Sequence, residues 1–247
     1  MSNERCHKVN IWQLRGDRMA PKLGMAKALA LDGNGVVYRR KREVVDALVE
    51  ALASQGLIFS KEKLRSVYLE LQERAFTGEL PYKNMVEELH RQLSLGSQLA
   101  LASLDQLIQK FSADIEIYPE LPSVLRELRS RGIRVGMLTN SIHPAQVKAK
   151  WLRNVGVDDL FDLIVSSVEE RCKKPSRELF QRFSARIGFP PQNIAFVGHE
   201  IEEIEGAKKA GFIAIALGCP EARADFHIQR LEELLRLPIW PEEKEAE

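Results

Sequence analysis

The stretch AKALALDGNGVV, residues 26–37, indicates the fold of the rest of the chain. Its first six residues are apolar except for Lys27, and so short a run fits a strand that is buried on both faces of a parallel sheet. Asp32 and a Gly-Asn-Gly segment follow at once, and an acid among glycines forms a tight turn. We therefore predict a buried strand that ends in an acidic turn.

Four further apolar runs have the length and character of the first, and helical stretches separate them from residue 118 onward. Strands that alternate with helices form right-handed crossovers, which build a doubly wound parallel sheet. The predicted fold class is therefore α/β, with a Rossmann-like core. The expected strands are residues 26–31, 133–138, 163–168, 194–197 and 213–217, and the expected helices are residues 122–131, 145–154, 177–186 and 202–210.

Residues 39–115, which follow the first strand, have a different pattern. Apolar residues recur there at helical spacing in four groups, and turn-forming glycines separate the groups. We predict an inserted α-helical bundle, a cap that lies over the carboxyl edge of the sheet. The α/β core then comprises residues 25–38 and 116–240.

The two ends of the chain fit neither unit. Residues 1–24 have no clear periodicity, so we expect either a disordered N-terminal extension or a start assigned too early, with Met19 or Met25 as the natural start. Residues 241–247 form an acidic tail that we expect to be solvated.

Composition argues against several classes of protein. The formal net charge is +1, so charge alone gives no argument for nucleic acid or a membrane as a partner. No apolar run approaches about 18 residues, and the N-terminal segment lacks the apolar core of a secretory signal. The three cysteines, Cys6, Cys172 and Cys219, lie far apart and form no CxxC pair, which indicates reduced thiols. We therefore expect a cytoplasmic protein.

Polar residues follow the expected strands at the point where each strand ends. Asp32 follows the first strand, and Thr139 and Asn140 follow the second. Lys174 follows the third strand after a short loop, and His199 follows the fourth. Ligands bind at the carboxyl ends of the strands in open parallel sheets, so these side chains are expected to converge. Each alone could be a turn, a helix cap or a solvated charge, but four such turns together indicate a functional site.

These residues resemble the motifs of the haloacid dehalogenase (HAD) superfamily, in the subclass with an inserted helical cap. Asp32 matches the nucleophile of the family's Asp-x-Asp-Gly-Thr/Val motif, and Thr139 in GIRVGMLTNS matches the hydroxyl residue of its second motif. Lys174 in KKPSRELF matches the lysine of the third motif, and VGHEIEEIEGAKKAGF matches the fourth. The resemblance runs from about Lys27 to Leu237. It implies a hydrolase-like protein whose phosphate-binding residues are Gly33, Thr139, Asn140 and Lys174.

Replacements in the first and fourth motifs distinguish this chain from the family's pattern. Asn34 stands where the family has its second acid, His199 stands where it has a metal-binding Asp, and Glu203 replaces a later acid. In a family phosphatase the first Asp attacks phosphorus, the second moves the proton, and Mg²⁺ bridges the first Asp and the phosphate. An amide cannot move that proton, and Mg²⁺ prefers oxygen ligands to imidazole. The expected metal site, Asp32, Asn34, His199 and Glu203, is therefore weak or absent for Mg²⁺, with another divalent metal as the alternative.

Three interpretations follow for the expected catalytic residues Asp32, Asn34 and Lys174. The first is a pseudoenzyme that binds a small phosphorylated or anionic molecule, or a protein partner, with little turnover. The second is an active phosphohydrolase with an altered metal site. The third is a metal-independent dehalogenase-type hydrolase in which Asp32 attacks carbon and Arg39 or Arg40 holds the substrate. The sequence has no GxGxxG or P-loop motif to favour an unrelated nucleotide-binding module.

Overall fold

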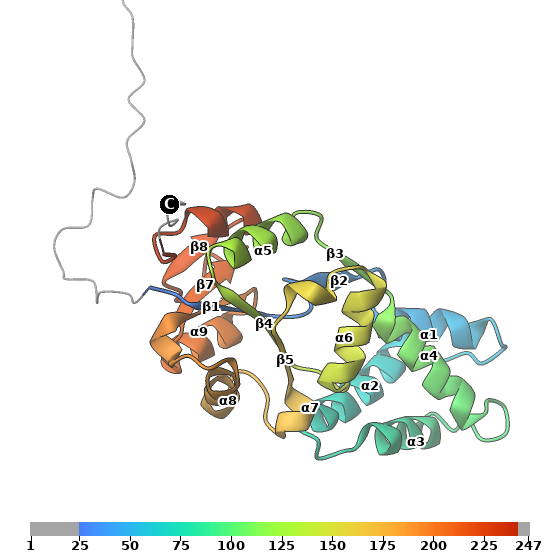
Figure 1. Cartoon of the computed structure of the whole chain (residues 1–247). Coiled ribbons are helices and arrows are strands. Elements are labelled where there is room, and N and C mark those ends of the chain that lie inside the picture. The colour runs from blue at the N-terminus through green and yellow to red at the C-terminus, as the bar shows by residue number, and fades with distance from the viewer. Residues whose placement is uncertain (1–24, 242–247) are drawn as a thin grey trace, which may run out of the picture.

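The computed structural model describes residues 25–241, and its centre is a sheet of six parallel strands in the order β5-β4-β1-β6-β7-β8 (Figure 1). The central strand β1 pairs with β4 on one side and with β6 on the other. The turn after β1 therefore lies at the middle of the carboxyl edge of the sheet. The strands are β1 (Ala28–Leu31), β4 (Arg134–Thr139), β5 (Leu163–Ser166), β6 (Ile194–Gly198), β7 (Ile213–Leu217) and β8 (Phe226–Ile228).

Helices cover both faces of this sheet, which confirms the predicted α/β fold class. Alternate residues of β1 face the two layers: Leu29 and Leu31 join the cluster around α5, whereas Ala28 and Ala30 join the cluster around α8. The small alanines leave room for the phenylalanines of α8 on that side. The core helices are α5 (Leu121–Ser130), α6 (Ala145–Asn154), α7 (Ser167–Glu170), α8 (Arg177–Ile187) and α9 (Ile201–Lys209), with 3₁₀ turns η2 (Asp158–Leu160), η3 (Pro191–Asn193) and η4 (Leu231–Arg236).

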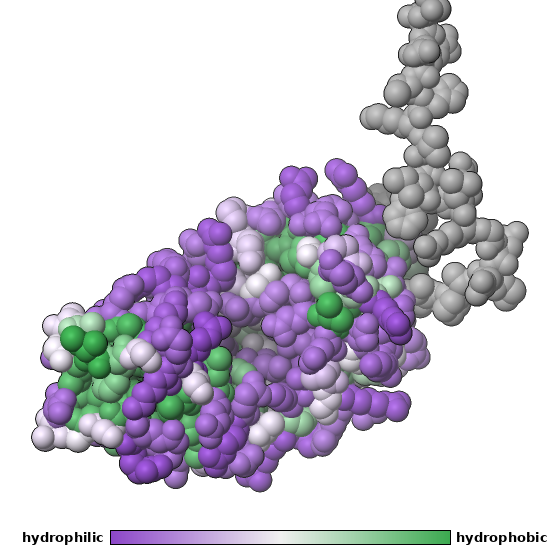
Figure 2. Space-filling model, turned by 180° about the vertical axis from the view of Figure 1, so that it is seen from behind, coloured by the Kyte–Doolittle hydropathy of each residue, from purple (hydrophilic) through white to green (hydrophobic). Residues whose placement is uncertain are grey.

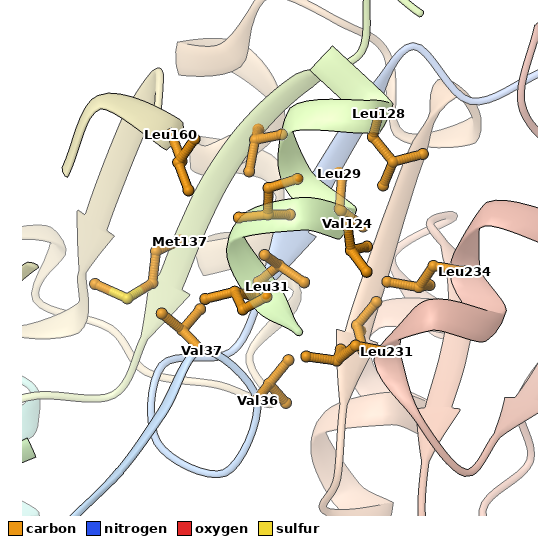
Figure 3. Packing of buried hydrophobic residues seen from close by; sticks show 14 of the residues in the cluster. Leu29, Leu31, Val36, Val37, Val124, Leu128, Met137, Leu160, Leu231 and Leu234 are labelled. Carbon is orange, nitrogen blue, oxygen red and sulfur yellow. The ribbon is translucent and has the colours of Figure 1, made fainter. Parts of the chain in front are cut away.

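The turn after β1 is anchored in the core by its own apolar residues. Val36 and Val37 are fully buried and belong to the same cluster as Leu29, Val124 of α5 and Leu231 of η4. Figure 3 shows these side chains gathered around helix α5. Burying a valine side chain stabilises a fold by about 1.5–3 kcal/mol, so the pair holds the acidic turn in place.

Four helices between β1 and α5 form a second hydrophobic cluster, separate from the clusters of the sheet. They gather on one side of the molecule, away from α5, α8 and α9 (Figure 1). A short antiparallel ribbon, β2 (Tyr38–Arg40) with β3 (Ile115–Ile117), joins them to the core and crosses both predicted boundaries of the cap. The division into core and cap stays a prediction. The four helices are α1 (Val44–Ala53), α2 (Lys61–Phe76), α3 (Tyr82–Gln92) and α4 (Leu101–Ala113).

All five predicted strands are present, with ends displaced by no more than two residues. The prediction for residues 163–168 is wrong at its end, because Ser167 begins the short helix α7. Strand β8 and the β2–β3 ribbon were not predicted. The expectations for residues 1–24 and for most of the acidic tail lie outside the described residues.

The surface agrees with a fold whose apolar residues are mostly internal. Figure 2 shows that the face opposite to that of Figure 1 is mostly hydrophilic, with apolar residues gathered toward the end formed by α1–α4. Within residues 25–241, none of the helices has the length and apolar character that crossing a membrane requires.

Candidate active site

A cleft of about 400 Å³ lies between the carboxyl edge of the sheet and helix α2. The separate turns that follow β1, β4, β5 and β6 place their polar side chains in it, and α2 contributes Gln72, Glu73 and Phe76. All of the predicted site residues except the buried Gly33 line this cleft. Those that do so are Asp32, Asn34, Thr139, Asn140, Lys174, His199 and Glu203.

Asp32 is the buried acid at the bottom of the site, with 6% of its surface exposed. Its Oδ1 accepts a hydrogen bond of 2.7 Å from the backbone N–H of Gly33 and another from the Lys174 ammonium. Burial alone would raise the pKa of Asp32, but Lys174 and His199 hold this pKa below its ordinary value. Asp32 is therefore an ionised carboxylate at neutral pH, the form that can act as a nucleophile.

Gly33 allows the acidic turn after β1 to lie close to β4. A Cβ atom at this position would stand 2.8 Å from Oγ1 of Thr139 and 3.2 Å from the hydroxyl of Tyr38, so only glycine fits without displacement. Thr139 is nearly fully buried, and it lines the cleft. The Gly33 N–H is already bonded to Asp32, and its predicted role in phosphate binding stays a prediction.

Lys174 links the two buried acids of the site. Its ammonium bonds to Asp32 and also donates to Oε2 of Glu203 at 2.6 Å. Burial raises the pKa of Glu203 to about 7, although Lys174 opposes that rise. Burial would lower the pKa of Lys174, but Asp32 and Glu203 together raise it. One ammonium thus lies between a fully ionised acid and a partly protonated one.

Asn140 holds the loop that bears Lys174. Its Oδ1 accepts the backbone N–H of Lys174 at 2.8 Å, and its Nδ2 donates to the Lys174 carbonyl and to Oε1 of Glu203 at 3.2 and 3.1 Å. The amide is thereby committed to contacts within the protein. Its predicted phosphate-binding role stays a prediction, while the structure gives it an evident part in orienting Lys174.

His199 lies beside the second oxygen of Asp32. Its Nδ1 is 3.4 Å from Oδ2 of Asp32, and its Nε2 is 3.9 Å from a carboxylate oxygen of the exposed Glu200. The ring rests on Gly35, which has a positive φ of 89° and where a Cβ would stand 2.5 Å from Cε1 of the imidazole. The contact with Asp32 raises the pKa of His199, outweighing burial, which lowers it.

These residues do not fit an octahedral Mg²⁺ ion. Three of the four carboxylate oxygens of Asp32 and Glu203 are bonded to Lys174, Asn140 or the Gly33 N–H, and the fourth faces the imidazole of His199. Mg²⁺ needs hard oxygen ligands at close range, and a nitrogen ring is a poor substitute. Within residues 25–241, no cluster of three or more His, Cys, Asp or Glu side chains has an arrangement that could hold a metal.

The remaining predicted residues differ in their placement. Asn34 is exposed at the rim of the cleft, and its backbone forms an isolated bridge with Tyr38. Arg39 points to solvent and pairs with Glu116 at 2.5 Å. Arg40 lines the cleft and donates to the Ser112 carbonyl at 2.8 Å, so it alone of the two arginines is placed to meet a ligand.

Sequence reasoning missed the side of the cleft formed by α2. Gln72, Glu73 and Phe76 follow one another at the spacing of one helical face, and Glu73 bonds to Lys173, the neighbour of Lys174. The helix itself was predicted from its apolar face, but nothing in its polar face indicates which core loop it meets. The contact between α2 and this loop joins residues 100 positions apart in the sequence.

Comparisons with known proteins agree with this geometry. Residues 26–211 match the sequence profile of haloacid dehalogenase-like hydrolases. A glyceraldehyde 3-phosphate phosphatase of Methanopyrus kandleri is 26% identical over 85% of this chain and 96% of its own length. A phosphatase of Mycobacterium tuberculosis is 29% identical over 57% of this chain, and the match covers 63% of that protein, less than two thirds of its length.

Solved structures show the same fold. The L-2-haloacid dehalogenase of Xanthobacter autotrophicus, with chloropropionic acid covalently bound, has a TM-score of 0.66 and 22% identity, and the match covers 86% of this chain and 98% of that one. The profile match includes all four strand-end turns described above, and the structural likeness extends to the inserted helices. The chain therefore belongs to the haloacid dehalogenase-like hydrolase family.

Proposed function

We propose that this protein binds a small phosphorylated or anionic molecule over Asp32 and hydrolyses phosphate esters slowly or not at all, without the help of Mg²⁺. The observation that supports this most directly is the imidazole of His199 beside Oδ2 of Asp32, where the family's magnesium ion would need an oxygen ligand. Lys174 and Thr139 remain in the cleft as an ammonium and a hydroxyl suited to phosphoryl oxygens.

The reduced turnover follows from the two replaced groups. Asn34 cannot donate a proton to the leaving oxygen or activate water, and such acid–base help is worth about 10²–10⁴-fold in rate. Without a bridging metal, the charge that develops on the phosphoryl group is met by the basic side chains that line the cleft, which are Lys174, Lys173, Arg40 and His199. Binding of the anion needs fewer of these groups than catalysis does. We therefore expect the protein to keep its affinity for the anion although its phosphatase activity is low.

The relatives favour a small ligand. The glyceraldehyde 3-phosphate phosphatase of Methanopyrus kandleri acts on a three-carbon phosphate, as its name states. A cleft of about 400 Å³ can hold a molecule of that size, with α2 closing one side. We therefore propose a phosphorylated metabolite of a few carbons as the ligand.

The test is a calorimetric titration with inorganic phosphate in the presence of EDTA, paired with hydrolysis of p-nitrophenyl phosphate with magnesium, manganese, cobalt or zinc. Asp32→Asn serves as the inactive reference. We expect metal-independent phosphate binding and turnover that hardly exceeds the reference with any metal. Metal-stimulated turnover that vanishes in Asp32→Asn would instead mean an active phosphohydrolase with an altered metal site. Absence of phosphate binding would overturn the proposal.

A second candidate function, metal-independent hydrolysis at carbon, is favoured by an ionised Asp32 and by the placement of Arg40 in the cleft. Asp32 would attack the carbon that bears the halogen, the carbon–halogen bond would break, and halide would leave with the electron pair. Water would then cleave the aspartyl ester. Release of chloride from 2-chloropropionate, lost in Asp32→Asn, is the expected sign, and no release above that reference rules this function out.

A further inference from the structure

Lys148 of helix α6 is a buried lysine next to the candidate site, with 2% of its surface exposed. Its ammonium nitrogen lies 4.1 Å from the ring centroid of Trp151 and 5.3 Å from that of Tyr38. Among residues 25–241 it makes no ion pair with a carboxylate. Burial, reinforced by the charge of Arg40, lowers the pKa of Lys148 well below its ordinary value, and Asp32 opposes this shift.

Lys148 makes a hydrogen bond to a residue of the acidic turn that follows β1. Its Nζ donates to the hydroxyl of Tyr38 at 2.7 Å. Tyr38 is itself 1% exposed, and its backbone closes the turn by donating to the Gly33 carbonyl at 3.1 Å and accepting from the Gly35 N–H at 2.8 Å. Lys148 thus holds the side chain of the residue whose backbone completes the turn after Asp32.

The hydroxyl of Tyr38 also meets Thr139. Both hydroxyl oxygens crowd the same face of Gly33, at 3.2 and 2.8 Å from the point where a Cβ would stand. Burial raises the pKa of Tyr38 to about 12, while the nearby hydroxyl of Thr139 works against that rise. The phenol therefore stays neutral at physiological pH, and it links Lys148 on one side with Thr139 in the wall of the cleft on the other.

A purely structural role accounts poorly for Lys148. A buried ammonium with no carboxylate partner is costly, and an apolar side chain of similar length would fill the same space at lower cost. Lys148 also occupies the buried face of α6, three and four residues before Trp151 and Leu152, where the pattern calls for an apolar residue. Costly polar groups of this kind cluster at functional sites.

We propose that Lys148 is a positioning residue of the anion site. Through the Tyr38 hydroxyl it holds Thr139 and the acidic turn in the geometry that binds the anion. Lys148 does not line the cleft, so it acts without touching the ligand. The inference rests on the proposed function for its effect on binding, but the chain of contacts from Lys148 to Thr139 can be tested without any ligand.

The experiment compares Lys148→Met, Tyr38→Phe, the double variant and the control Lys150→Met, a change at an exposed lysine on the same helix. One measurement is the dissociation constant for inorganic phosphate by calorimetry. The other is the methyl resonance of Thr139 in the ligand-free protein, assigned by its loss in Thr139→Ser. Lys148→Met and Tyr38→Phe each keep the buried volume nearly unchanged, and thermal unfolding checks that the variants fold.

We expect Lys148→Met and Tyr38→Phe each to weaken phosphate binding about tenfold, as for the loss of one hydrogen bond to a charged group, and the double variant to lose no more than either single one. The Thr139 methyl resonance should shift in these variants and stay unchanged in Lys150→Met. The unfolding temperature should not be lower in Lys148→Met than in the wild type. A Thr139 resonance that does not respond to Lys148→Met would overturn the inference. If the wild type binds phosphate, an unchanged phosphate affinity in Lys148→Met would also overturn the inference. If the wild type binds no phosphate, the proposed function fails, and the Thr139 resonance alone decides whether Lys148 positions that hydroxyl.

Discussion

At the scale of single residues, we expect the side chain at position 199 to determine whether a divalent cation binds beside Asp32. The imidazole lies 3.4 Å from the oxygen of Asp32 that no other side chain engages. We predict that His199→Asp creates measurable Mg²⁺ affinity, at least tenfold above wild type, because it replaces the ring with a hard oxygen ligand. A calorimetric magnesium titration checks this, with the neutral variant His199→Asn as the control. Equal affinities of wild type and His199→Asp would contradict it.

Restoring both replaced acids should also raise the rate of phosphate-ester hydrolysis. Asn34→Asp supplies a carboxyl group at the rim of the cleft, and His199→Asp supplies the metal ligand. We expect the double variant to hydrolyse p-nitrophenyl phosphate about 10²–10⁴-fold faster than wild type with magnesium, the usual worth of a general acid–base group. The single variants are the controls. A double variant as slow as wild type, yet able to bind Mg²⁺, would mean that the carboxyl at position 34 cannot reach the leaving group.

Gly35 and Gly56 form a matched pair for measuring how tightly His199 packs. Both have positive φ values, 89° and 79°, but a Cβ at Gly35 would meet the imidazole at 2.5 Å, whereas nothing lies within 4 Å of one at Gly56. Gly56→Ala should lower the free energy of unfolding by about 1 kcal/mol through backbone strain alone. Gly35→Ala should lower it by a further 1–3 kcal/mol or so through overpacking. Urea denaturation measures both, and similar losses would show that the ring moves aside freely.

The sequence predicts which side chains converge but not how they point. Carboxyl ends of parallel strands share one edge, so Asp32, Thr139 and Lys174 can be assigned to one site from the sequence alone. The contact of His199 with Gly35 and the use of the Asn140 amide by the Lys174 loop depend on side-chain rotamers and on loop geometry. Lys148 was open to prediction, since a lysine on the apolar face of a helix departs from the expected pattern.

At the scale of elements, helix α2 meets the core through an ion pair between Glu73 and Lys173. Both side chains are partly exposed, so Glu73→Ala should change the unfolding temperature little. Because this pair joins α2 to the loop that bears Lys174, we expect its loss to speed both the association and the dissociation of inorganic phosphate. Stopped-flow binding measures these rates. Glu79→Ala, which breaks an exposed pair with Arg74 near the end of the same helix, is the control, and equal rates in the two variants would contradict the prediction.

The elements that sequence reasoning missed are those with little local signal. Strand β8 has three residues, of which only Ile228 is buried, so it shows neither alternation nor an apolar run. The β2–β3 ribbon pairs Tyr38 with Ile117 across the whole helical insertion, and such long-range pairing leaves no trace in either short segment. The predicted strands of the sheet are continuous apolar runs, which is why their positions were predicted to within two residues.

At the scale of the whole molecule, the buried charges of the site make stability depend on pH. The pKa of Glu203 is about 7 in the folded protein, above its ordinary value of 4.5, because the side chain is buried. Between these values the folded protein binds more protons than the unfolded chain, so stability is highest below this window and falls as pH rises through it. The pKa of His199 is also raised, so its contribution is likewise lost as pH rises above 6.5. Asp32 acts in the opposite sense, since its lowered pKa gives stability that is lost only as pH falls below about 3.8.

We therefore predict that the free energy of unfolding declines between pH 5 and pH 8, by up to about 3 kcal/mol from Glu203, with each pKa unit worth about 1.4 kcal/mol. Urea denaturation at a series of pH values measures the decline. Glu203→Gln should remove most of the decline, because the amide neither gains nor loses a proton, and His199→Asn should remove the part that continues above pH 7, the pKa of Glu203 in the folded protein. A wild-type protein whose stability stays level or rises from pH 5 to pH 8 would mean that Glu203 is ionised throughout, with two carboxylates sharing one ammonium beneath the cleft.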